Sequence, residues 1–215
     1  MEEKKTLEVT LDEARELYNS SSKILKAIAL KCFSENELKL PSFCEIKTFE
    51  DAVKVLKMDI DDANTIVKSI KKTSKATAAM YKLSLIRKAL NLGHDFHLTK
   101  DPKECSIYYP YNPFVTKGST YYNDELNSGK IEKIGKIKSE GVEYYILGGC
   151  TITDCYTGFG AFYSSDGVGI ATANFGFLGC ATKEITKHFS KYFGMLITEA
   201  KFGDLPDFKI TERIY

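Results

Sequence analysis

The sequence has no apolar run near the ~18 residues that a membrane-spanning helix needs, and its N-terminal segment is charged, unlike a signal peptide. We therefore expect a soluble protein that stays in the cytoplasm where it is made. Histidine is scarce, with three residues in 215, which leaves few bases for serine catalysis. The sequence also lacks a GxSxG elbow, a GK[ST] phosphate loop and a complete dinucleotide fingerprint.

Net charge gives no general attraction to nucleic acid or to an acidic membrane. Thirty basic residues face 29 acidic ones, for a net charge of +1. Hydrophobic residues make up 43% of the chain and charged residues 27%, as in ordinary folded proteins. Any nucleic-acid partner would thus need a local basic patch.

The six cysteines do not form the paired spacings of a zinc site or the dense pattern of a small disulfide-rich domain. We expect them to be reduced and mostly buried. His94, His97 and Cys105 place three ligand types close together, but no CxxC or HxxxH pair completes the set. The sequence therefore predicts no metal site and no cofactor.

Several short helices are predicted over residues 10–93. Apolar residues recur at helical spacing behind each capping residue, and Gly93 supplies a left-handed stop after the last helix. The expected caps are Thr10, Ser34, Thr48, Asp59 or Asp61, and Ser74. Short links between these helices predict a helical bundle.

Composition and periodicity change after Gly93. Nine of the 13 tyrosines lie between Tyr108 and Tyr163, and apolar and polar residues begin to alternate. Two hairpins and an edge strand are expected, with strands at residues 131–138, 142–147, 159–163, 168–174 and 208–215. This pattern predicts a small antiparallel sheet.

A last amphipathic helix, about residues 182–202, follows a cap at Thr182 and has a strong apolar stripe. The predicted fold class is α+β, with an N-terminal helical bundle followed by a small antiparallel β-sheet packed by this one C-terminal helix. The division between a helical part (1–93) and a Gly/Tyr-rich β part (94–215) is expected near Gly93 to Lys103. No Pro/Ser-rich linker separates the two parts, so we expect them to pack together.

Tyrosine-rich loops are the first candidate site. Tyrosine offers a rigid ring with a polar tip, which suits recognition of proteins or carbohydrates. The candidate protein-binding residues are Tyr108, Tyr109, Tyr111, Phe114, Tyr121 and Tyr122. The alternative interpretation is that these rings cover the sheet edge or are buried against the helical part.

A basic segment is the second candidate. The window from Ala63 to His94 contains seven basic residues and no acidic one. A helix continuing through this window would align its lysines on one face, where they could neutralise phosphates; these nucleic-acid-binding candidates are Lys68, Lys71, Lys72 and Lys75. A solvated face of the bundle is the alternative.

Cys180 and His188 are the third candidate, as a thiol before a helix N-terminus with a histidine base nearby. The alternative is a small buried cysteine beside a surface pair of Glu184 and His188, and on this basis we predict no catalytic residue.

Several segments resemble a known family. They are Tyr108–Lys117, Gly148-Gly149, Phe175–Ile185, His188-Phe189 and Lys191–Phe193, together with a capped helix, serine break and Phe-Ser-Glu-x-Glu-Leu ending over Thr10–Leu38. The chain is similar along nearly its whole length to uncharacterised proteins encoded by phages and prophages of anaerobic gut bacteria. The resemblance implies no activity, cofactor or catalytic residue, but it favours a phage accessory or virion-associated protein.

The sequence therefore predicts a non-enzymatic phage protein that acts through protein–protein contacts, with another copy of itself or with a phage or host protein, and not with a membrane. It would be virion-associated or a host-directed accessory, located in the host-cell cytoplasm or incorporated into the virion. A nucleic-acid-binding regulator that uses the basic helix face is one alternative, and a cysteine-dependent enzyme is another.

Overall fold

The computed structural model describes residues 9–39, 41–93, 107–116, 126–129, 131–148, 150–154, 169–171 and 178–215. Its contacts divide the chain into two compact units, Met1–Ser42 and Phe43–Tyr215, which we call the N-terminal and C-terminal units. The described part of the N-terminal unit is helical, and the C-terminal unit combines helices with a sheet.

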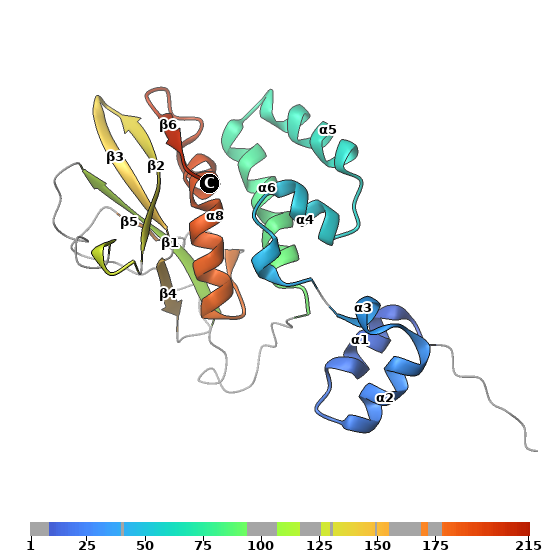
Figure 1. Cartoon of the computed structure of the whole chain (residues 1–215). Helices are drawn as coiled ribbons and strands as arrows, with labels where there is room; N and C mark the ends of the chain where they lie inside the picture. Colours follow the sequence, from blue (N-terminus) through green and yellow to red (C-terminus); the bar gives the residue numbers. More distant parts are fainter. Residues whose placement is uncertain are drawn as a thin grey trace, which may run out of the picture. The chain divides into compact units, whose positions relative to one another are not determined.

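Three short helices form the described part of the N-terminal unit: α1 (Leu11–Asn19), α2 (Lys23–Cys32) and α3 (Glu35–Leu38) (Figure 1). Capping boxes open α1 and α3, as predicted: the N–H of Thr10 donates to Glu13 at 2.8 Å, and that of Ser34 donates to Glu37 at 2.9 Å. Among the residues of this unit that the structure describes, the fully buried apolar ones are few, namely Ala14, Ala29 and Leu38. So small a core leaves apolar side chains of α2 at the surface.

The helices of the C-terminal unit are the 3₁₀-helix η1 (Phe43–Glu45), α4 (Phe49–Val55), α5 (Ile60–Lys71), α6 (Lys75–Leu90) and α8 (Lys183–Phe202). Side chains of Thr48, Asp59, Ser74 and Thr182 accept hydrogen bonds from first-turn amides of α4, α5, α6 and α8. These caps confirm the predicted helix starts, and Asp59 rather than Asp61 is the cap of α5. Gly93 follows α6 with φ of +81°, the left-handed conformation predicted for it.

An antiparallel sheet makes up the other part of this unit. Its strands are β1 (Ile107–Thr116), β2 (Glu132–Ser139), β3 (Val142–Gly148), β4 (Cys150–Asp154), β5 (Gly169–Ala171) and β6 (Lys209–Arg213). The strand order is β4-β1-β3-β2-β6, and β5 also pairs with β1. All the pairings among the described strands are antiparallel.

The predicted hairpin and edge strand are both present. β2 and β3 are joined at Glu140 and Gly141, whose φ values of +49° and +80° are those of a two-residue type I′ turn. β6 pairs with β2 and confirms the edge strand expected over 208–215. Of the second expected hairpin, β5 is present and pairs with β1, whereas residues 159–163 lie outside the described residues.

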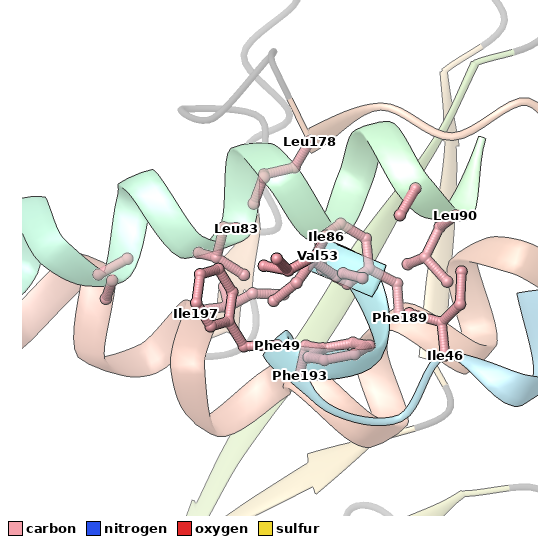
Figure 2. Packing of buried hydrophobic residues seen from close by; sticks show 14 of the residues in the cluster. Ile46, Phe49, Val53, Leu83, Ile86, Leu90, Leu178, Phe189, Phe193 and Ile197 are labelled. Atoms are coloured by element: carbon pink, nitrogen blue, oxygen red, sulfur yellow. The ribbon is translucent and has the colours of Figure 1, made fainter. Parts of the chain in front are cut away.

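Helix α8 lies between the sheet and α6 (Figure 1). On the helical side, its buried residues Phe189, Phe193 and Ile197 join one hydrophobic core with α4 and α6 (Figure 2). Helix α5 adds Ala63 and Val67 to this core. On the sheet side, Met195 packs with three buried isoleucines of β2 and β3, namely Ile134, Ile137 and Ile146. One helix therefore supplies side chains to two cores, and the predicted α+β class is confirmed.

The units divide the chain at a different place from the sequence-based division near Gly93 to Lys103. The boundary between the two units falls between Ser42 and Phe43. Helices α4 and α6 belong to the C-terminal unit because they share their core with α8. The helices before Gly93 thus belong to two units. The packing of α6 on α8 agrees with the expectation that the helical and β parts contact each other.

Candidate functional site

The predicted tyrosine-rich loop is in fact strand β1. Tyr108, Tyr109 and Tyr111 pair with Thr153, Ile152 and Cys150 of β4, and all three tyrosines are half-buried. The loop prediction is wrong here because the backbone of this run is taken up by the sheet. Tyr121 and Tyr122 lie outside the described residues.

Phe114 of β1 packs inside the C-terminal unit. Its ring centroid lies 5.7 Å from that of Phe202 in α8 and 6.4 Å from that of Tyr144 in β3. Tyr108 is also tied down, since its backbone exchanges hydrogen bonds of 3.0 and 2.8 Å with that of Cys180. These contacts favour the structural interpretation of β1 over a free recognition loop.

The four candidate lysines do not lie on one face of a continuous helix. α5 ends at Lys71 and α6 begins at Lys75, because Ser74 caps a new helix. Lys68, Lys71, Lys72 and Lys75 are all exposed around the turn between these helices. The single-face arrangement is therefore wrong, although the local concentration of positive charge remains.

Cys180 and His188 do not form a nucleophile–base pair. Cys180 is fully buried, and its burial raises the pKa of the thiol to about 11. The polar groups that act on the thiol are Thr186, Asn91 and Arg87. A thiol with this pKa is protonated at neutral pH, so the structure gives no activated cysteine here.

We expect Cys180 to resist alkylation in the native protein and to react after unfolding. Among the three cysteines whose burial the structure describes, Cys32 and Cys44 are exposed, and they provide internal controls in the same chain. Treating native protein with iodoacetamide at pH 8 and mapping peptides by mass spectrometry would measure this. Labelling of Cys180 as fast as that of Cys32 would contradict the expectation.

His188 is part of a row of aromatic rings rather than of a surface pair with Glu184. The centroid of the His188 ring lies 5.5 Å from the Phe43 ring centroid and 4.5 Å from the Tyr192 ring centroid. The ring centroids of Tyr192 and Tyr215 are in turn 5.1 Å apart. Phe43, His188, Tyr192 and Tyr215 are called the aromatic row below. The row begins at η1, crosses α8 and ends at Tyr215, which is 44% exposed.

Burial holds His188 in its neutral form, and a hydrogen bond fixes which ring nitrogen carries the proton. Nε2 lies 2.7 Å from the carbonyl oxygen of Ile46, which can only accept, so Nε2 carries the proton. Burial lowers the pKa of this histidine below its usual value. His188 is therefore an uncharged member of the row at neutral pH.

Charged groups surround the exposed end of the row. The ammonium groups of Lys47 and Lys191 each lie 5.5 Å from the ring centroid of Tyr192, and Lys191 is also 5.1 Å from that of Tyr215. Glu132 accepts hydrogen bonds from Lys191, at 2.8 Å, and from the Tyr215 hydroxyl. These contacts lower the pKa of Glu132 and raise the pKa of both Lys191 and Tyr215, so all three keep their usual charge states at neutral pH.

The sequence-based candidates do not include Tyr192 or Tyr215 of the aromatic row, or the lysines beside them, Lys47 and Lys191. The row and its charged neighbours come from residues 43–47, 132, 188–192 and 215, which only the fold brings together. Lys191-Tyr192 does fall within a segment that carries the family resemblance. That overlap was the one sequence signal at this place, and it did not distinguish a packing role from a binding role.

Among the described residues, no cluster of three or more His, Cys, Asp or Glu side chains could hold a metal ion. His94, His97 and Cys105 lie outside the described residues. No helix in the described ranges is long and apolar enough to cross a membrane. No protein-family model matches the chain, and no curated protein or solved structure shows significant similarity to it.

Proposed function

We propose that this chain is a non-enzymatic protein that acts through contacts with other proteins. Its C-terminal unit would make one such contact through Tyr192, Tyr215, Lys47 and Lys191, which we call the tyrosine–lysine surface. The observation that carries the proposal is Tyr215, which is 44% exposed and yet held by Glu132 and by the ring of Tyr192.

A tyrosine that is fixed before binding loses little conformational freedom when a partner covers it. Tyrosine is also enriched among the residues that dominate binding energy at protein interfaces. Lys47 and Lys191 border the rings. Lys47 is exposed and could pair with a carboxylate of the partner, whereas Lys191 already pairs with Glu132. The surface thus combines an aromatic contact area with a charged rim.

The resemblance to proteins of phages and prophages supports a phage setting for these contacts. The partner would be a virion component or a host protein, and the chain would act in the host-cell cytoplasm or within the particle. Mass spectrometry of purified particles, together with a pull-down from infected cells, tests both versions. Absence of the protein from virions and from every reproducible host complex would overturn the proposal.

Replacing Tyr215 and Tyr192 with alanine is expected to reduce recovery of the partner at least about tenfold, as for other interface hot spots. Tyr145→Ala is the matched control, because this half-buried tyrosine also has two lysine ammoniums, those of Lys133 and Lys136, 5.0 and 5.7 Å from its ring centroid. Recovery of the complex is measured by quantitative pull-down. Equal recovery with the double variant and the control would exclude this surface as the contact.

Nucleic-acid binding is a second candidate function. Lys68, Lys71 and Lys72 are exposed and form no ion pair within the described part of the chain, so they are available to phosphates. A gel shift that weakens with salt, and that disappears when these lysines and Lys75 are changed to glutamate, would support it. Unchanged binding in that variant would exclude it.

A further inference from the structure

We infer that α2 of the N-terminal unit is a docking helix for an acidic amphipathic helix of a partner protein. This inference rests on the proposed function, because it names the kind of partner that the N-terminal unit contacts. It concerns a helix of its own (Figure 1) and none of the residues of the tyrosine–lysine surface.

Apolar side chains of α2 are left uncovered. Ile24 is 73% exposed and Leu30 is 47% exposed, and Ala27 between them is exposed as well. These residues are three apart, so successive members lie on neighbouring positions of one side of the helix, each rotated by about 60°. Among the described side chains of α2, only Ala29 is fully buried in the core of the unit.

Lysines border this apolar strip. Lys23, Lys26 and Lys31 are exposed, and α2 contains no acidic residue. The strip runs obliquely along the helix. Lys23 and Lys26 lie on one side of it, one turn before Ala27 and Leu30 respectively, and Lys31 lies on the other side, one turn after Ala27. Positive charge therefore flanks the strip on both sides. The three lysines form no ion pair in the described ranges of the chain.

The position of Lys23 adds a second argument for an acidic partner. It lies in the first turn of α2, where the helix dipole disfavours positive charge and no acidic side chain offsets it. A partner carboxylate at this place would offset an unfavourable interaction that no residue of this turn compensates. Acidic groups on both borders of a partner's apolar stripe would match α2 in the way that charged flanking positions match in paired helices.

The length of α2 limits the contact. Its ten residues span about 15 Å, which suits a partner segment of about three turns with apolar residues at helical spacing. The described exposed apolar side chains of α2 are aliphatic, without the aromatic anchors typical of membrane-surface helices. These features favour a protein helix over a lipid surface.

The test uses the full chain and two fluorescent synthetic helical peptides with the same leucine stripe, one flanked by glutamates and the other by lysines. Anisotropy titration is expected to show binding of the acidic peptide and about tenfold weaker binding of the basic one, since three exposed ion pairs each contribute a factor of about two. The Lys23→Glu/Lys26→Glu/Lys31→Glu variant should reverse this preference. Ile24→Asp/Leu30→Asp should weaken binding of both peptides.

The control is Lys68→Glu/Lys71→Glu/Lys72→Glu, which makes the same charge change on exposed lysines at the C-terminal end of α5 and should keep the preference. Circular dichroism and thermal melting of each variant show that it folds. Equal affinity for the two peptides, no binding of either, or binding of phosphatidylglycerol vesicles in place of the acidic peptide would each overturn the inference. If the triple variant of α2 still recovers the partner from infected cells, α2 is not the docking helix, whereas the proposed function stands.

Discussion

Replacing Phe189 with alanine is expected to lower the free energy of unfolding of the C-terminal unit by about 3–5 kcal/mol. This side chain is 0% exposed and is among the largest fully buried ones. Its ring packs edge-on against Phe193, with centroids 5.7 Å apart, inside the core that α8 shares with α4 and α6 (Figure 2). Removing the ring leaves a cavity that two packed layers cannot easily close.

Urea denaturation followed by circular dichroism measures this loss, with Leu205→Ala as the control. Leu205 is 52% exposed, so its truncation should change the free energy of unfolding by less than about 0.5 kcal/mol. A loss below about 1 kcal/mol for Phe189→Ala would show that Phe189 is not tightly packed.

The same variant tests where the chain divides. Because α6 and the sheet both pack on α8, helices α4 to α6 should lose stability together with the sheet and unfold in one transition. A division near residue 93 would instead give separate transitions for the helices and the sheet. Hydrogen exchange resolved by peptide distinguishes these results.

Local signals in the sequence were sufficient to locate most of the helices. Thr10, Thr48 and Ser74 cap helices where a short polar side chain precedes an apolar stripe, because a first-turn amide needs an acceptor whatever the rest of the fold does. The β2–β3 hairpin was predictable for the same reason, since alternation and a glycine turn act within a few residues.

Strand β1 was not predictable by these rules. It contains Pro110 and Pro113, and proline cannot donate to a strand ladder. Even so, Pro110 pairs in register with Thr151, and Pro113 pairs with Gly169. Partners remote in sequence give this run its extended conformation, so local propensity could not identify it.

The candidate site was beyond sequence reasoning for a related reason. Tyr192 is separated in sequence from Phe43 and from Glu132, and only the packing of η1, β2 and α8 brings these residues together. The segment after Ala63 was a stronger sequence-based candidate than Tyr192, because its seven basic residues and its lack of acidic ones are visible within one short stretch of the sequence. Contacts between distant segments leave no such local trace.

Replacing Gly194 of α8 with alanine is expected to lower the free energy of unfolding by about 2–4 kcal/mol, although glycine to alanine in a helix usually raises it by about 1 kcal/mol. A Cβ atom at this position would come within 3.0 Å of the Asn112 side-chain amide and of Ile134. Asn112 cannot easily move, since its Nδ2 donates to the carbonyl oxygens of Leu147 and Ser190, both at 2.9 Å. Overpacking and broken hydrogen bonds of a buried amide each cost about 1–3 kcal/mol, which outweighs the gain in helix propensity.

A double-mutant cycle with Asn112→Ala identifies the cause of this loss. Asn112 is 0% exposed, and its Oδ1 has no hydrogen-bond partner in the described structure. This buried, unpaired acceptor already lowers the stability of the native protein, which limits the cost of truncating the side chain. Truncating it removes the atom that the new methyl group would strike and makes room between β1 and α8. Gly194→Ala should therefore cost at least about 1 kcal/mol less in the Asn112→Ala background, as urea denaturation of the four proteins would measure. Additive losses would instead mean that the methyl group is excluded by Ile134 and the backbone, and that the amide does not set the distance between α8 and the sheet.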